Sequence, residues 1–125
     1  MLVDDNRLER KIISHTLTSR FNRTIKVDEV TDGSQALKYL DTQQYDLVIT
    51  DLVMPNIEGI RLIHEIHKYH SPCKIIAISG SNPYYLYLAK KTGIDGVFTK
   101  PVPKDLFLQK IEALLSMPGN QSINN

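Results

Sequence analysis

Two apolar stretches decide the fold class of this chain: LVI at residues 47–49 and IIAI at residues 75–78. Each is continuously apolar rather than alternating, which is typical of strands buried on both faces of a parallel sheet. Between them, Ile60, Ile63 and Ile66 recur at the spacing of one helix face. Strand, helix and strand in this order predict a parallel pair joined by a right-handed crossover.

The same alternation extends over the whole chain. Strands are predicted at residues 1–3, 25–30, 47–50, 74–79 and 97–99, with a helix after each. The first helix is predicted from inward-facing Leu8, Ile12, Ile13 and Leu17, and the second from Ala36, Leu37 and Leu40 after Asp32-Gly33-Ser34. The third contains the three isoleucines after Gly59, and the fourth lies between Ser81-Asn82-Pro83 and Gly93. The fifth follows Pro103 and faces inward with Phe107, Ile111, Leu114 and Leu115. This pattern predicts an α/β fold, a flavodoxin-like doubly wound parallel sheet of five strands in the order 2-1-3-4-5, with five helices.

Length and composition indicate one globular domain. The chain has 125 residues and a net charge of +1, which gives no support to direct nucleic-acid binding. Its single cysteine, Cys73, excludes an internal disulfide, and no apolar run is long enough for membrane insertion. A cytoplasmic protein is therefore the simplest class. We expect the domain to cover residues 1–117 and residues 118–125 to be a polar flexible tail, because Pro118-Gly119 should end the last helix.

Polar side chains follow four of the predicted strands. Asp4 and Asp5 follow the first strand, Asp51 the third, Ser79 closes the fourth and Lys100 follows the fifth. The carboxyl ends of parallel strands meet at one edge of the sheet, where ligands bind in this fold. Clustered carboxylates favour Mg²⁺, and a lysine and a hydroxyl beside them would surround a phosphoryl group. Asp51, on the central strand, is the natural acceptor.

These residues resemble the receiver domain of two-component response regulators, of the single-domain CheY-like kind. The resemblance rests on ordered motifs along essentially the whole chain: Asp4-Asp5, Val30-Thr31-Asp32-Gly33, Asp51-Leu52-Val53-Met54-Pro55 with Gly59, Ile78-Ser79-Gly80, and Thr99-Lys100-Pro101. It implies a signalling switch rather than a turnover enzyme. The implied phosphoryl donor is a histidine kinase or a histidine phosphotransfer protein.

The resemblance also implies a role for each motif residue. Asp51 is the implied phosphoacceptor, and Ser79 and Lys100 are the implied contacts of the phosphoryl group. The implied Mg²⁺ ligands are Asp4, Asp5, Asp51 and the backbone carbonyl of Val53. The peptide bond between Lys100 and Pro101 is expected to be cis, as is typical of the family.

The sequence departs from the family pattern at several positions. Only three residues precede Asp4, where the family has a longer strand. Val97 occupies the position of the family's switch aromatic, while Phe98 is expected on the other face of the sheet. Val53 and Ser81 match positions that tune the lifetime of the phosphoryl group, and Val53 cannot bind an attacking water. Gln35 replaces a more common glutamate.

Tyr84, Tyr85 and Tyr87 cannot all face inward from one helix, so at least one ring should be exposed. Exposed aromatic rings often anchor partners. The family uses its fourth helix, fifth strand and fifth helix for output partners and for dimers. We therefore expect this face to bind an unknown output protein or a second copy of the chain, although partial burial of the rings is an equal alternative.

Other functions agree less well with the same residues. A haloacid-dehalogenase-type Mg²⁺-dependent phosphatase would need a second aspartate at Val53. A flavin or nucleotide binder would need a phosphate-binding loop after the first strand, where Asp4 and Asp5 stand. A docking-only receiver would not need the intact acidic site. A phosphorylation switch, as a single-domain protein or as one domain of a longer chain, agrees best with the sequence.

Overall fold

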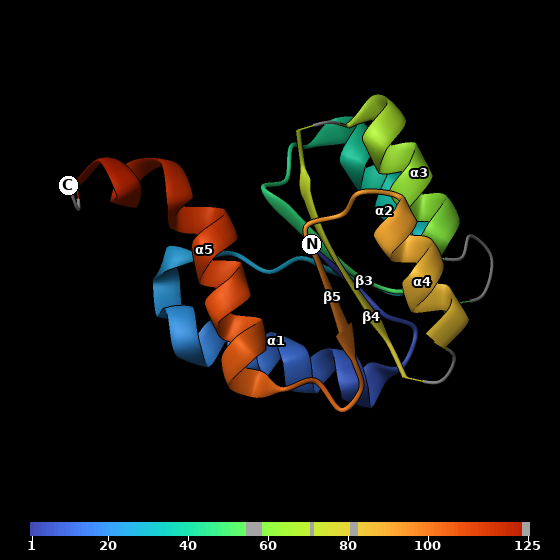
Figure 1. The fold of residues 1–125 in the computed structure, drawn as a ribbon, viewed down its shortest axis with the longest axis horizontal. Helices are drawn as coiled ribbons and strands as arrows, with labels where there is room; N and C mark the ends of the chain where they lie inside the picture. The colour runs from blue at the N-terminus through green and yellow to red at the C-terminus, as the bar shows by residue number, and fades with distance from the viewer. Residues whose placement is uncertain (55–58, 71, 81–82, 124–125) are drawn as a thin grey trace.

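The computed structural model describes residues 1–54, 59–70, 72–80 and 83–123. Five parallel strands form one sheet in the order β2-β1-β3-β4-β5, as predicted. Helices α1 and α5 lie on one side of it, and α2, α3 and α4 lie on the other (Figure 1). The elements are β1 (Leu2–Val3), α1 (Arg7–Phe21), the short 3-10 helix η1 (Asn22–Thr24), β2 (Glu29–Val30), α2 (Gly33–Thr42), β3 (Leu47–Asp51), α3 (Gly59–Tyr69), β4 (Lys74–Ser79), α4 (Pro83–Lys91), β5 (Gly96–Thr99) and α5 (Lys104–Ile123).

The two stretches that decided the fold class are the central strands. β4 covers the predicted residues, and β3 extends one residue further, to Asp51. Their five paired positions run from Leu47 opposite Lys74 to Asp51 opposite Ile78. All of β3 and all but the first residue of β4 are buried, in agreement with a parallel sheet covered on both faces.

β2 is shorter than the predicted 25–30 strand and contains only Glu29 and Val30. Its one neighbour in the sheet is β1, which offers Leu2 and Val3 as partners. Residues 25–27 therefore have no facing strand, although Ile25 and Val27 still pack against the hydrophobic core. The number of residues that β1 offers for pairing therefore sets the length of β2, and the apolar character of the segment does not.

The sheet separates two hydrophobic cores. On the side of α2, α3 and α4, the core includes Val48, Leu62, Ile63, Ile66, Ile75 and Ala77. On the side of α1 and α5, it includes Ile13, Leu17, Ile49, Ile76, Ile78, Phe107 and Ile111. Alternate residues of β3 and β4 thus point to opposite cores, so each central strand is held from both faces.

The predicted inward face of α1 is only half right. Ile13 and Leu17 are buried, but Leu8 is 70% exposed and Ile12 is 57% exposed. Arg10 occupies the buried position one turn before Ile13. Its guanidinium donates from Nε to Glu29 and from Nη1 to the Asp4 carbonyl. A charged residue can occupy a core-facing position when its donors are satisfied, and this rotates Leu8 and Ile12 toward solvent.

The other helix ends agree less closely with prediction. The predicted stop of the last helix at Pro118-Gly119 is wrong, because α5 continues to Ile123. An interior proline removes one helical hydrogen bond and favours a kink, but it does not end this helix. α4 ends at Lys91, near the predicted stop, and Gly93 has a φ of 76°, which favours glycine. Ser81 and Asn82, predicted to begin this helix, lie outside the described residues.

In the described part of the chain, no helix combines the length and apolar character that a membrane crossing requires.

Candidate functional site

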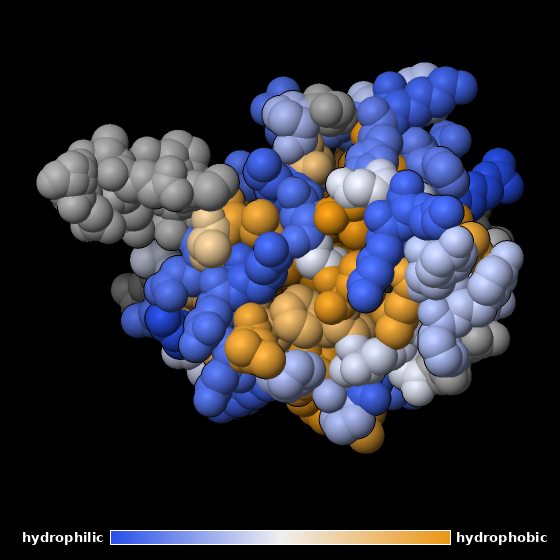
Figure 2. All heavy atoms as spheres, viewed as in Figure 1, coloured by the Kyte–Doolittle hydropathy of each residue, from blue (hydrophilic) through white to orange (hydrophobic). Residues whose placement is uncertain are grey.

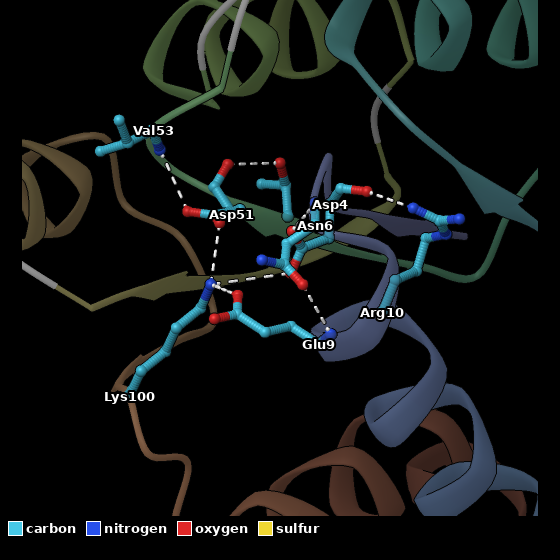
Figure 3. A network of polar contacts seen from close by, with 8 residues as sticks. Asp4, Asn6, Glu9, Arg10, Asp51, Val53 and Lys100 are labelled. Carbon is cyan, nitrogen blue, oxygen red and sulfur yellow. Dashed lines mark hydrogen bonds and ion pairs between the residues drawn. The ribbon is translucent and has the colours of Figure 1, made fainter.

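The polar residues at the strand ends come together at one edge of the sheet. Asp51 ends β3 and Ser79 ends β4, while Asp4 directly follows β1 and Lys100 directly follows β5. Val3 pairs with Thr50, which places Asp4 and Asp51 side by side at the ends of neighbouring strands. Figure 3 shows Lys100 reaching toward Asp51 from the segment after β5. The convergence predicted from strand order is therefore present.

The acidic cluster consists of Asp4, Asp5 and Asp51. One oxygen from each carboxylate lies within 4.8 Å of the other two. Asp4 and Asp51 are buried and Asp5 is exposed, so the cluster opens to solvent on one side. Carboxylates this close repel one another, and a small divalent cation bound by oxygen atoms relieves that repulsion. The donor set fits Mg²⁺ with room for bound water.

The environment of Asp4 shows how this cluster is balanced. Burial raises the pKa of Asp4 above its usual value. The backbone N–H of Asn6 donates to its Oδ1 at 2.9 Å and, with the charge of Lys100, opposes that rise. The neighbouring charges of Asp51 and Glu9 act in the same direction as burial. The carboxylates around Asp4 therefore depend on a nearby positive charge.

Lys100 places a positive charge against the acidic cluster. Its Nζ lies 2.9 Å from Asp51 Oδ2 and 3.7 Å from Asp4 Oδ2, and it also contacts the Glu9 carboxylate. Burial alone would lower the pKa of Lys100, but hydrogen bonds to Glu9 and Asp51 outweigh it and raise the pKa above its usual value. Lys100 is thus a fixed cation at neutral pH.

Ser79 offers an uncommitted hydroxyl group. Its Oγ is buried and, among the described residues, has no hydrogen-bond partner. A buried polar group without a partner costs about 1–3 kcal/mol, which a ligand oxygen can recover. The backbone of Ser79 is held in place, because its carbonyl accepts the Lys100 N–H at 2.9 Å. This unsatisfied donor suits an oxygen-rich group arriving at Asp51.

The segment after β3 fixes the Asp51 side chain. The backbone N–H of Val53 donates to Asp51 Oδ1 at 3.1 Å, which leaves Oδ2 facing Lys100. The backbone N–H of Gly59 donates to the Leu52 carbonyl at 3.1 Å and brings α3 against the end of β3. A side-chain carbon at Gly59 would lie 2.6 Å from Leu52 Cα, so only glycine fits. Pro55 lies outside the described residues.

Two residues of this site were missed by the sequence analysis. Glu9 contacts Lys100, and Arg10 donates from Nη1 to the Asp4 carbonyl at 2.9 Å and from Nε to Glu29 Oε1 at 3.0 Å. Arg10 is detectable as a break in the apolar rhythm of α1, three residues before Ile13. Glu9 is in the first turn of α1, where acidic residues are common, so its sequence position carries no special signal.

The remaining expectations fall on β5 and its flanks. The Lys100–Pro101 peptide bond is cis, which confirms the expectation. Phe98 packs edge to face against Phe107 of α5, with ring centroids 5.4 Å apart, and so lies on the α1–α5 side of the sheet. Val97, which stands at the position of the family's switch aromatic, pairs with Ala77 of β4. Ser81 lies outside the described residues.

The three tyrosines of α4 divide between surface and core. Tyr84 is 58% exposed and Tyr87 is 53% exposed, whereas Tyr85 is partly buried against the core. The Lys91 ammonium lies 5.1 Å from the centre of the Tyr87 ring. The expectation that at least one ring is exposed is therefore confirmed.

Comparison with known proteins gives the same class of molecule. The response regulator receiver domain family matches residues 1–112. The chain is 34% identical over 121 residues to 3',5'-cyclic-nucleotide phosphodiesterase regA of Dictyostelium discoideum, covering 92% of this chain and 15% of that protein. It is 30% identical to chemotaxis protein CheY of Halobacterium salinarum, covering 93% of this chain and 95% of that protein. A receiver protein structure from Pseudomonas putida superposes with a TM-score of 0.79 at 28% identity, covering 89% of this chain and 92% of that one.

A doubly wound sheet with an acidic pocket, a lysine and a serine at its carboxyl edge defines a receiver module. The chain belongs to the response regulator receiver domain family of two-component systems. Members of this family are signalling switches. Since the chain spans 15% and 17% of the first two curated relatives, the activities of those whole proteins are not transferred to it.

Proposed function

We propose that this chain is a phosphorylation-activated switch in which Asp51 accepts a phosphoryl group from a phosphohistidine. The supporting observation is the environment of Asp51 Oδ2: Lys100 Nζ lies 2.9 Å away, and Asp4 and Asp5 complete an acidic cluster beside it. The donor is a histidine kinase or a histidine phosphotransfer protein. The switch is not a turnover enzyme, because its product is its own modified side chain.

The transfer step follows from these positions. A carboxylate oxygen of Asp51 attacks phosphorus, the P–N bond breaks, and its electron pair returns to an imidazole whose other nitrogen carries a proton. Lys100 and the Ser79 hydroxyl then donate to the phosphoryl oxygens. Mg²⁺, held by Asp4, Asp5, Asp51 and the Val53 carbonyl, would neutralise part of the negative charge.

The alternatives are less well supported by this site. A haloacid-dehalogenase-type phosphatase needs a general acid two residues after the nucleophile, where Val53 presents a 46% exposed apolar side chain. A docking-only receiver has no need for Lys100 against Asp51 or for a buried Ser79 hydroxyl that finds no partner among the described residues. We propose that residues 1–117 form the receiver unit, on its own or within a longer protein, and that it acts in the cytoplasm, in keeping with its single cysteine.

We place the output surface on α4, β5 and α5. β5 is an edge strand, and its residues are half-buried or exposed. Figure 2 shows hydrophobic side chains gathered between α5 and α4, across the position of β5. Exposed Tyr84 and Tyr87 lie on α4, one of the three elements of this surface. An output protein, or a second copy of the chain, is the proposed occupant.

A second apolar surface adjoins Asp51 and suits the phosphoryl donor. A groove of about 640 Å³ is lined by Ile12, Ile13, Pro101, Val102 and Phe107, together with Glu9 and Lys100 of the site. Exposed Leu8 precedes Ile12 by one turn on α1. The groove shares Lys100 with Asp51, so we propose that a protein that delivers phosphohistidine to Asp51 binds the exposed face of α1.

Changing both Leu8 and Ile12 to serine is expected to slow phosphotransfer from a protein donor about tenfold or more, because exposed apolar anchors dominate binding energy. Phosphorylation by acetyl phosphate should stay within about twofold, since a small donor needs no docking surface. Time courses with both donors check this. Tyr69→Ser on α3, which removes a 63% exposed side chain from the other face of the sheet, is the control. Equal slowing with both donors would contradict a docking role.

Intact mass measurement tests the proposed function. The chain is incubated with acetyl phosphate in Mg²⁺ and, separately, with a chelator. We expect a single added phosphoryl group in Mg²⁺ and little or none with the chelator. An adduct that forms equally without a divalent cation would contradict the role assigned to the acidic cluster.

A further inference from the structure

Glu9 shares Lys100 with the proposed phosphoacceptor. The Glu9 carboxylate reaches the Lys100 ammonium from α1, while Asp51 Oδ2 accepts from the same ammonium at 2.9 Å (Figure 3). The backbone of Glu9 is held by the helix cap, since its N–H donates to Asn6 Oδ1 at 2.9 Å. The side chain of Glu9 is 42% exposed and that of Lys100 is 20% exposed, so this ion pair is partly shielded from solvent.

This contact opposes what phosphorylation requires. An ammonium has three donors, and in the structure one is directed to Glu9 and one to Asp51. A phosphoryl group on Asp51 needs donors from Lys100 for its own oxygens. It also brings negative charge close to the Glu9 carboxylate, and like charges at short range repel. Glu9 therefore competes with the phosphoryl group for the donors of Lys100.

We propose that Glu9 is a positioning residue that holds Lys100 in the unphosphorylated chain and so lowers the affinity of the site for a phosphoryl group. The inference rests on the proposed function of Asp51, because it concerns the same site. It implies that release of Lys100 by Glu9 accompanies phosphorylation. Formation of the phosphorylated state then includes breaking one ion pair between α1 and the segment after β5.

Glu9→Gln isolates the charge from the shape of the side chain. The amide oxygen of glutamine can still accept from Lys100, but its negative charge is gone. With Mg²⁺ saturating, we expect beryllofluoride, a phosphoryl mimic, to bind Glu9→Gln about two- to fivefold more tightly than wild type, the range for a partly exposed charge interaction. The difference should shrink as salt is raised. Glu9→Asp keeps the charge and should return the dissociation constant toward the wild-type value.

The matched control is Glu112→Gln on α5. It makes the same change in net charge and removes one carboxylate of an exposed ion pair, with Arg20 at 2.9 Å. Dissociation constants for beryllofluoride are measured by fluorine NMR, together with Mg²⁺ affinity and thermal unfolding. Tighter binding in Glu9→Gln alone supports the proposal. No tightening in Glu9→Gln, or equal tightening in Glu112→Gln, overturns it while leaving the function of Asp51 standing. A wild-type chain that binds neither beryllofluoride nor a phosphoryl group overturns both.

Discussion

Replacing Asp51 with asparagine is expected to abolish the phosphoryl adduct that the wild-type chain forms with acetyl phosphate and Mg²⁺. An amide has the size of the carboxylate but lacks its nucleophilic oxygen. The nearby carboxylates should not take over, because Lys100 lies 3.7 Å from Asp4 and 2.9 Å from Asp51, and Asp5 is exposed. Intact mass measurement under identical conditions compares the two chains.

Asp105→Asn is the matched control for this substitution. It makes the same chemical change at an exposed residue in the first turn of α5. This variant should accept a phosphoryl group as wild type does. Because a misfolded Asp51→Asn chain would also fail to react, its thermal unfolding is measured alongside. A folded Asp51→Asn chain that still gains the adduct would show that another residue is the acceptor.

Replacing Gly59 with alanine is expected to lower the free energy of unfolding by about 3 kcal/mol, at the upper end of the usual cost of overpacking. The added carbon would meet backbone and not a flexible side chain, at 2.6 Å from Leu52 Cα and 3.1 Å from the Asp51 carbonyl carbon. Either α3 or the end of β3 must move, and both bear on Asp51. Denaturant unfolding gives the stability, and acetyl phosphate gives the effect on the site.

Gly96→Ala provides the comparison within the same sheet. Its added carbon would lie 3.4 Å from the Ile76 and Lys110 side chains, which are free to adjust by small amounts. Alanine also restricts the unfolded chain more than glycine does. We expect a change within about 1 kcal/mol for this variant. A Gly59→Ala chain as stable as Gly96→Ala would contradict the packing described between α3 and β3.

The central strands and the site edge could be predicted from sequence because each depends on local pattern. Continuous apolar residues identify β3 and β4, because short runs of this composition between helical segments are typical of strands buried on both faces. Once the strand order follows, the carboxyl ends of β1, β3, β4 and β5 must meet. The acidic cluster of Asp4, Asp5 and Asp51 is therefore a consequence of topology and needs no knowledge of side-chain conformation.

The parts that sequence did not predict depend on contacts between distant segments. Leu8 and Ile12 fit the apolar spacing of a helix, but Arg10 occupies the inward position because the Asp4 carbonyl and Glu29 satisfy its donors. Glu9 meets Lys100 across 91 positions of sequence, which no local pattern records. The length of β2 likewise depends on strand pairing and not on composition. α5 continues past Pro118-Gly119, which the composition of that segment did not predict.

Locating the phosphoryl group in the chain shows directly whether Asp51 is the acceptor. An aspartyl phosphate is an acyl phosphate, which borohydride reduces to an alcohol and so converts the residue to homoserine. After reaction with acetyl phosphate and Mg²⁺, the chain is reduced, digested and mapped by mass spectrometry. We expect homoserine at position 51 and unchanged aspartate at Asp4 and Asp5. Homoserine at either of those positions, or none in a chain that carries the adduct, would contradict this role of Asp51.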